Sequence, residues 1–470
     1  MKTYAELKDI ILKKMEELLP EVTELSEWMA DHPERSGKEY ETSKKIVEFM
    51  RERGYEVEYP YAGVETAFKA VCGANNHTHK MAFLAEYDAL PGIGHACGHN
   101  VSGSISVLAA LAMKDLQDEL DCDFHLIGTP NEEDDGAKCA MVDQGIFDSY
   151  DMSSKVHLFD KNQLYGILLG LHQFEFTFHG KAAHGATAPW EGVNALNAAQ
   201  LMMHGIDMLR QHVTPDERMH GIYRNGGLAP NIVPEDASVE VYVRALDKKY
   251  HAGVDERVEN CAKGAAIMTG CTYEKKLTAA MYDNMNILST GVEALREAYE
   301  ELGIELDSQK DHDTIFGSSD IGNVSFVCPT FHPTIKIVDR GIAIHTRDFE
   351  KNVHGETAVK ALREGAGVLA LQAAKIFGDE AKLQAMKEEY EASINYLSED
   401  TAAAAQMIVD AGIFAQAPVA QKAIPNCNLC FIAGADMQPA LGAFLDTMFQ
   451  VAAPSVGGAV PADDFYYVGQ

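Results

Sequence analysis

The spacing of apolar residues changes along the chain, and these changes predict its elements. Residues 3–53 carry amphipathic helix patterns. Short apolar runs follow around Val71, at 81–85 and at 124–128, and a helical pattern over 104–115 separates the last two. Buried apolar runs that alternate with helices are typical of a mostly parallel sheet with helices on both faces. The first part of the chain is therefore predicted to be an α/β domain.

The pattern changes near Leu168. Residues 173–179 and 237–244 alternate apolar and polar side chains with a period of two, as half-exposed antiparallel strands do. Helical patterns over 192–211 and 250–270 follow these two runs. The order strand, helix, strand, helix, strand predicts a smaller α+β domain inserted into the first one.

Later patterns set the expected domain limits. A helix over 291–302, an apolar strand over 334–338 and a helix over 357–375 would return the chain to the first domain. We therefore expect four segments: the α/β domain's first part at 1–170, the inserted domain at 171–285, the α/β domain's second part at 286–380, and a C-terminal extension without an assigned role at 381–470.

Composition and charge exclude some classes of protein. The net charge of −32 argues against nucleic acid and against an anionic membrane surface as partners, because both require clustered Lys and Arg. No apolar run approaches the length of a bilayer-spanning helix, and the amino terminus lacks the apolar core of a signal peptide. Nine scattered cysteines suit a reducing compartment. We expect a cytoplasmic protein.

Candidate chemistry is concentrated in residues 85–100, directly after a predicted strand. This segment holds Asp88, His95, Cys97 and His99, and a thiol with two imidazoles at such spacing suits a metal ion. Three glycines and a proline interrupt the backbone, so we expect these side chains on a shaped loop and not on a helix face. Such a loop between a strand and a helix is typical of an α/β active site.

A second constellation, residues 128–136, follows the strand at 124–128. It contains Glu132 and Glu133, and adjacent carboxylates suit a division of roles in which one binds metal and the other takes a proton from water. Alone, the pair would be interpreted as a solvated acidic turn. His157 and His345 are further candidates, although a single histidine is more often structural than a ligand. The neighbouring Cys/His loop favours the functional interpretation.

Several motifs then occur in a fixed order. They are Glu86-Tyr-Asp-Ala-Leu-Pro91, His95-Ala-Cys-Gly-His-Asn100, Gly128-Thr-Pro-Asn-Glu-Glu133, Gly180-Lys-Ala-Ala-His184, Pro189-Trp-Glu-Gly-Val-Asn-Ala195, Gly226-Gly-Leu-Ala-Pro-Asn-Ile-Val-Pro234 and Gly317-Ser-Ser-Asp-Ile-Gly-Asn-Val324. Together they resemble the M20 metallopeptidases and amidohydrolases, in the branch of aminobenzoyl-glutamate hydrolase, Xaa-Arg dipeptidases and auxin-conjugate hydrolases. The resemblance covers about residues 10–375, and several independent motifs in register are specific where one would be weak.

The resemblance implies a site with two divalent metal ions, with zinc favoured and manganese or cobalt as alternatives. The positions that match family ligands are Cys97, His99, Glu133, His157 and His345. Cys97 would be a bridging thiolate, and Glu132 matches the general base. Asp88 matches the carboxylate that orients a ligand histidine.

The resemblance also assigns roles to the inserted domain, as a lid and dimerisation domain on a catalytic α/β domain. His184 matches the histidine that reaches a neighbouring subunit's site to stabilise the oxyanion, and Asn231 matches a substrate-binding position. A homodimer or higher homo-oligomer is therefore expected. One departure is Glu86, which stands where many family members carry a metal-binding histidine.

The function implied is hydrolysis of the amide bond of an N-acyl or N-aroyl amino acid or of a dipeptide, through a metal-activated water. One alternative keeps the metals and changes the bond, as in a deaminase that acts on an aryl amine. A second is a non-catalytic binding protein on a hydrolase fold. That alternative predicts a missing base or ligand, and the motifs lack neither.

Overall fold

The computed structural model describes residues 2–309 and 315–394. Most of the predicted C-terminal extension, from residue 395 onward, lies outside these ranges. Residues up to Lys387 form one compact unit. Within the described ranges, none of the helices combines the length and the apolar character that crossing a bilayer requires.

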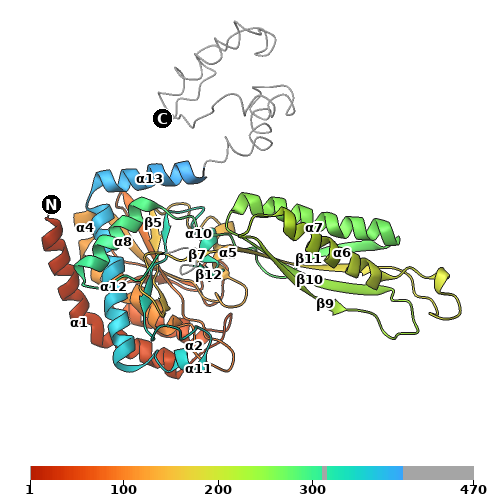
Figure 1. The fold of residues 1–470 in the computed structure, drawn as a ribbon. Coiled ribbons are helices and arrows are strands. Elements are labelled where there is room, and N and C mark those ends of the chain that lie inside the picture. Colours follow the sequence, from red (N-terminus) through yellow and green to blue (C-terminus); the bar gives the residue numbers. More distant parts are fainter. Residues whose placement is uncertain (1, 310–314, 395–470) are drawn as a thin grey trace, which may run out of the picture. The chain divides into compact units, whose positions relative to one another are not determined.

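The larger sheet is six-stranded and mostly parallel (Figure 1). Its strands, in spatial order, are β1 (Glu56–Glu58), β2 (Phe68–Val71), β4 (Cys122–Gly128), β3 (His79–Ala85), β5 (Met152–Ser154) and β13 (Thr330–Phe331). The four strands β4, β3, β5 and β13 run parallel, whereas β2 and β1 join antiparallel at one edge. The predicted sheet type is confirmed.

Helices cover both faces of this sheet. One group packs together on one face: α1 (Tyr4–Asp31), α3 (His99–Met113), α8 (Ser289–Glu301) and α12 (Gly355–Phe377). The other face packs Ala82 and Leu84 of β3 against α5 (Ala137–Asp143) and α10 (Ile321–Val324). Every residue of α3 is buried, which fits a central helix whose remaining positions are apolar apart from His99, Asn100 and three serines.

The remaining elements around this sheet are short, apart from two peripheral helices. Those helices are α2 (Tyr40–Glu52) and α13 (Glu380–Ile394), and the short ones are η1 (Lys114–Leu116), α4 (Gln117–Leu120) and α11 (Arg347–Glu350). Two parallel pairs of short strands join distant segments: β6 (His157–Phe159) with β14 (Thr334–Lys336), and β7 (Ile167–Leu168) with β12 (Ile315–Gly317).

The second sheet has four antiparallel strands and its own core. Its order is β11 (Thr272–Leu277), β8 (Gly170–His179), β10 (Asp236–Ala245) and β9 (Arg218–Asn225). The period-two pattern places Phe174, Phe176 and Phe178 on one face, which α6 (Ala195–Leu209) and α7 (Lys248–Thr269) cover (Figure 1). Two short helices, η2 (Pro189–Glu191) and η3 (Arg210–His212), flank α6.

The predicted element order of this sheet was wrong in one place, because β9 was missed. β9 is an edge strand, and of its eight residues only Met219 is buried. Gly221 further interrupts its pattern. A strand without a buried face lacks the alternation by which strands are recognised. The domain limits at residues 170, 285 and 380 stay a prediction.

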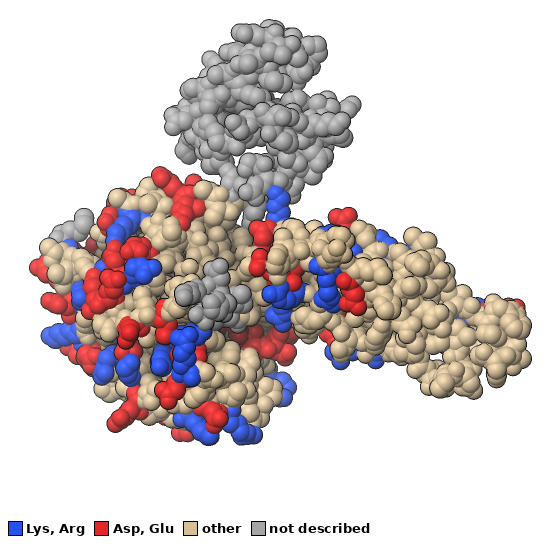
Figure 2. Space-filling model, in the orientation of Figure 1, with Lys and Arg blue, Asp and Glu red and all other residues tan. Residues whose placement is uncertain are grey.

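Charge is not distributed evenly over the surface. On the face shown in Figure 2, acidic and basic side chains intermingle over the part formed by the larger sheet and its helices, and no continuous basic track crosses the described residues. The outer part of the smaller sheet's domain is mostly uncharged in the same view. That domain carries most of the exposed large apolar side chains: Trp190, Met208, Ile222, Tyr223, Leu228, Ile267 and Met268.

Gly103 of α3 permits the close approach of this helix to the end of β3. A Cβ atom at Gly103 would lie 2.2 Å from the carbonyl oxygen of Glu86. We expect Gly103→Ala to push α3 off β3 and to lower the free energy of unfolding by about 1–3 kcal/mol in urea denaturation. Gly264→Ala is the control. It lies in α7 with nothing within 4 Å of its Cβ, and should be neutral or stabilising by up to about 1 kcal/mol. Equal stability of the two variants would contradict the packing argument.

Candidate metal centre and active site

Two groups of metal-ligating side chains meet at Cys97. Cys97, His99 and His157 form one group, and Cys97, Glu133 and His345 form the other; within each, the ligand atoms lie within 4.8 Å of one another. The Sγ atom of Cys97 is 3.3 Å from Nε2 of His157. Nε2 of His345 is 3.1 Å from Oε1 of Glu133. The structure therefore brings together the five residues that the resemblance selected, with the thiol shared between two groups.

The turn before α3 presents Cys97 and His99. Gly98 between them has a φ of +81°, and a Cβ atom there would lie 3.0 Å from Cβ of Leu158. Glycine suits both the left-handed backbone and the close approach. His99 is the first residue of α3, so the prediction that it lies on a loop was wrong. The helix begins five residues earlier than its apolar pattern, because its first turn holds buried polar residues, among them His99 and Asn100, which carry no apolar signal.

Hydrogen bonds fix the orientation of two histidines. Nδ1 of His157 donates to the backbone oxygen of Leu158 at 2.8 Å, which leaves Nε2 toward Cys97. Nδ1 of His99 donates to Oδ1 of Asp88 at 2.9 Å. Oδ2 of Asp88 accepts from the backbone N–H of Glu133 at 3.0 Å. Asp88 thus orients His99 and the Glu133 loop together, which is the arrangement that the resemblance implies for this carboxylate.

His345 is held in an uncommon backbone conformation. Its φ is +63°, in the left-handed region that a non-glycine residue rarely adopts. Its backbone N–H donates to the carbonyl of Ala96 at 2.9 Å, directly beside Cys97. Backbone strain of this kind persists where the surroundings over-determine it, and it is concentrated at functional sites.

The residues present fit a cation at this position. Nε2 of His99 and Oε1 of Glu133 are buried and make no hydrogen bond of regular geometry; each has an ion-pair contact, with Glu86 at 3.3 Å and His345 at 3.1 Å respectively. Burial, with Glu133 and Glu132 nearby, raises the pKa of the Cys97 thiol, so its thiolate needs a nearby positive charge. Burial also opposes a charge on His99, but Asp88 and Glu86 raise its pKa to about 10. Such surroundings favour bound positive charge.

Glu132 lies between the ligand groups and a second set of carboxylates. Its carboxylate oxygen is within 4.8 Å of ligand atoms of His99 and Glu133, and likewise of Glu86 and Asp320. Burial, Glu86 and Asp320 raise the pKa of Glu132 to about 8. A carboxylate beside metal-ligating atoms is placed to exchange a proton with a group bound there.

The two predicted residues of the smaller sheet's domain lie together but apart from the ligand groups. An isolated bridge pairs His184 with Ile232, and the backbone N–H of Gly185 donates to the oxygen of Asn231 at 2.8 Å. Nδ1 of His184 accepts from the N–H groups of Ala186 at 3.2 Å and Thr187 at 3.1 Å. His184 and Asn231 are exposed, and among the described residues neither belongs to a ligand group. With Nδ1 accepting, Nε2 of His184 carries the proton and is free to donate.

Sequence reasoning missed two buried lysines at the site. Lys138 is the second residue of α5 and Lys155 precedes β6; both are buried and both contact Glu86. For Lys138 the available signal was a charged residue among Ala and Cys neighbours, since lysine is rarely buried without a partner; the polar neighbours of Lys155 give no such signal. Sequence reasoning also missed Arg244 of β10. Its guanidinium donates to Oγ of Ser318 at 2.9 Å and so connects the smaller sheet to the segment after β12.

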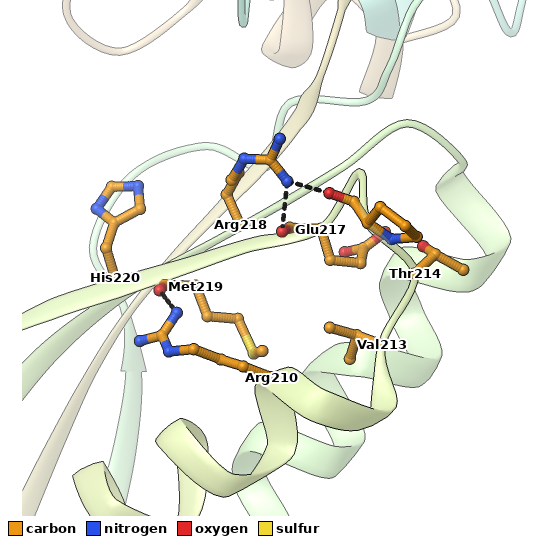
Figure 3. Close-up of a pocket in the computed structure, with 8 residues that line it drawn as sticks. Arg210, Val213, Thr214, Glu217, Arg218, Met219 and His220 are labelled. Carbon is orange, nitrogen blue, oxygen red and sulfur yellow. Dashed lines mark hydrogen bonds between the residues drawn. The ribbon is translucent and has the colours of Figure 1, made fainter.

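A separate hollow of about 520 Å³ lies in the smaller sheet's domain (Figure 3). It is lined by Arg210, Val213, Thr214, Pro215, Glu217, Arg218, Met219 and His220. The predicted site residues are not among them. Arg210 donates to the backbone oxygen of Met219, and Arg218 donates to that of Glu217 at 2.9 Å, so backbone carbonyls already bind both guanidinium groups. The hollow is not the site defined by the motifs.

The fold and the site together define a hydrolase of the metallopeptidase class. Residues 168–267 match the peptidase dimerisation domain of M20 enzymes. Xaa-Arg dipeptidase from Mus musculus is 34% identical over 348 residues, covering 71% of this chain and 80% of the relative. One of the polypeptides of the Escherichia coli p-aminobenzoyl-glutamate hydrolase is 27% identical, covering 78% of this chain and 92% of the relative.

Solved structures share the fold. A Bacillus subtilis protein described as a dinuclear metal-binding peptidase of the M20 family aligns with a TM-score of 0.62 and 19% identity, over 77% of this chain and 99% of that one. The chain belongs to the M20 peptidase family and is an amide hydrolase of that family.

Proposed function

We propose that this enzyme hydrolyses the amide bond of a dipeptide or of an N-acyl or N-aroyl amino acid at a centre of two divalent metal ions. The observation that carries the proposal is the pair of ligand groups that share Cys97, with Glu132 beside them. Relatives named for dipeptide and aminobenzoyl-glutamate hydrolysis support the substrate class. Both substrate types contain an amide bond to an amino acid.

Five residues would hold the metal ions. Cys97 would bridge them, His99 and His157 would complete one site, and Glu133 and His345 the other. When bound, the two ions supply Lewis acidity and a water of lowered pKa at neutral pH. A thiolate with three imidazoles favours zinc, and manganese and cobalt are the alternatives.

The chain's own residues would handle the proton and the developing charge. Glu132 would take a proton from the attacking water and return it to the leaving amine nitrogen. Asp88 would keep the imidazole of His99 in one tautomer and one orientation. The Nε2–H of His184 would donate to the carbonyl oxygen as it gains negative charge, and Asn231 would bind substrate beside it.

His184 would serve the site of a second copy of the chain. The supporting observations are its exposure, its place outside the ligand groups of the described residues, and the match to a dimerisation domain. The open edge of β9 exposes Ile222 and Tyr223, which suits association through this domain. We therefore propose residues 171–285 as a lid and dimerisation domain inserted between two catalytic segments at 1–170 and 286–380.

We also propose that the enzyme works in the cytoplasm. The seven cysteines among the described residues are free thiols, and six of them are buried. Unpaired cysteines suit a reducing compartment. The proposed partners are a small amide substrate and a second copy of the chain, with no role for nucleic acid or membrane.

A panel of amides tests the reaction. We expect the metal-reconstituted enzyme to split dipeptides, or N-acetyl and N-aminobenzoyl amino acids, into two organic fragments identified by mass spectrometry. Glu132→Gln should lower kcat by about 100-fold or more, because the proton acceptor is lost. Glu52→Gln, an exposed change at the end of α2, is the control. Release of ammonia without a second organic fragment, or an active Glu132→Gln variant, would overturn the proposal.

Metal content tests the shared thiolate. We expect Cys97→Ala to lose both ions, because Cys97 belongs to both ligand groups, whereas His157→Ala and His345→Ala should each weaken one site. Cys139→Ala, another buried cysteine outside those groups, should retain both. Elemental analysis after desalting measures the ratio of metal to protein. Full metal content in Cys97→Ala would refute the proposal that the Cys97 thiolate is shared by both metal ions.

Mixing two inactive variants tests whether His184 of one subunit acts in the active site of the other. His184→Ala and Glu132→Gln should each be nearly inactive alone. After the two variants are mixed and allowed to exchange subunits, half of the dimers would be hybrids with one intact site, so about a quarter of wild-type activity should return. Mixing His184→Ala with a double variant that carries both changes should restore nothing. A monomer with full activity would show that His184 does not act across subunits.

A further inference from the structure

A cluster of four buried charges lies directly behind the proposed active site. Glu86, Lys138, Lys155 and Asp320 are each at most 1% exposed. They come from four separate segments: the end of β3, the start of α5, the approach to β6, and the N-cap of α10. The reaction proposed above gives none of them a role.

Lys138 is the centre of this cluster. Its Nζ atom is 2.6 Å from Oε1 of Glu86 and 2.7 Å from Oδ1 of Asp320. Its backbone N–H donates to Oδ2 of Asp320 at 3.0 Å, so that carboxylate is held at both oxygens. The other oxygen of Glu86 is paired with Lys155 and lies 3.3 Å from Nε2 of His99.

Glu132 connects the cluster to the ligand groups. Its carboxylate lies within 4.8 Å of Glu86 and Asp320 on one side and of His99 and Glu133 on the other. Three carboxylates so close together, with Glu86 and Asp320 buried and Glu132 half-buried, repel one another strongly. Two of them are bound directly to Lys138. The position of the third therefore depends on the charge that Lys138 supplies.

The cluster is costly, which argues for a role beyond stability. Burying a charged group costs several kcal/mol even after partial compensation, and an apolar replacement for a buried ion pair is often no less stable. Burial opposes a charge on Lys138, yet Asp320, Glu86 and Glu132 hold its pKa above the ordinary value. Lys138 is thus a permanent cation beside the proposed general base.

We propose that Lys138 is a positioning residue of the hydrolytic reaction: its ammonium fixes Glu86 and Asp320 so that the Glu132 carboxylate faces the ligand groups. This inference rests on the proposed function. Without the cation, the carboxylates would separate and Glu132 would leave the geometry in which it exchanges a proton with the attacking water. Lys138 acts through Glu132 and touches neither substrate nor metal.

Lys138→Met, which removes the charge and keeps most of the side-chain length, tests the proposal. We expect kcat to fall about 100-fold while KM changes less than about threefold, because a displaced base slows the chemical step and leaves substrate binding intact. The metal content should stay at the wild-type level.

The chain offers a matched control in Lys375. This lysine is also buried between two carboxylates, with Nζ 2.9 Å from Glu297 and 2.5 Å from Glu301, and its side chain is 6% exposed. These partners are outside the proposed metal-ligand groups. Lys375→Met should cost comparable stability and leave kcat unchanged. A kcat for Lys138→Met equal to that of Lys375→Met would overturn the proposal.

A second variant keeps the test decisive if Lys138→Met folds poorly. Glu86→Gln combined with Lys138→Met removes one negative and one positive charge together, which restores the charge balance around Glu132. We expect the double variant to fold and to regain at least about tenfold in kcat over Lys138→Met, or to be measurably active where the single variant is insoluble. A folded, metal-loaded double variant with no recovery would also overturn the proposal. A wild-type enzyme inactive on every amide would instead refute the proposed function.

Discussion

The accumulation of carboxylates at the ends of β3 and β4 is the constraint on which the rest of this site depends. Glu86, Asp88 and Asp320 are buried, Glu132 and Glu133 are half-buried in the same small region, and no such group is stable without cations. The chain supplies two lysine side chains here, Lys138 and Lys155, and both contact Glu86. The remaining negative charge faces Cys97 and the histidines, which is where the proposed metal ions bind. Fold stability and metal affinity therefore have a common electrostatic origin.

The scaffold that holds these charges follows from elementary sheet geometry. β3 and β4 are parallel and in register, with Ala85 opposite Gly128, so the segments after both strands emerge at the same edge. Asp88 then joins the two segments, because it binds His99 from one and the backbone of Glu133 from the other. The close contact of Gly103 with Glu86 holds α3, and with it His99, against this edge. Backbone contacts thus fix the positions of these proposed ligands.

Much of the fold and most of the proposed ligand set could be predicted from the sequence, for identifiable reasons. Apolar runs mark buried strands directly, and the family resemblance selected Cys97, His157 and His345 from distant positions. The edge strand β9 could not be recognised, because exposed strands lack alternation. Lys138 and Lys155 were missed for a related reason: a single lysine carries no periodic signal, and its partners become apparent only after four segments are brought together. Sequence patterns therefore reveal residues that recur at fixed spacing. They do not reveal a residue such as Lys138, whose role is to neutralise carboxylates from distant segments of the chain.

The placement of His184 adds a physical argument for a site divided between domains. The catalytic segments are rigid where the carboxylates and lysines interlock, and such a cluster cannot open to admit a substrate without exposing unpaired charge. A hydrogen-bond donor for the developing oxyanion must nevertheless approach closely once substrate is bound. If His184 is that donor, as proposed, its place on a part of the chain with its own core would let it approach and withdraw while the ion cluster stays intact. Nδ1 of His184 accepts from two backbone N–H groups, so the ring would arrive with its Nε2 proton oriented and would need little further ordering.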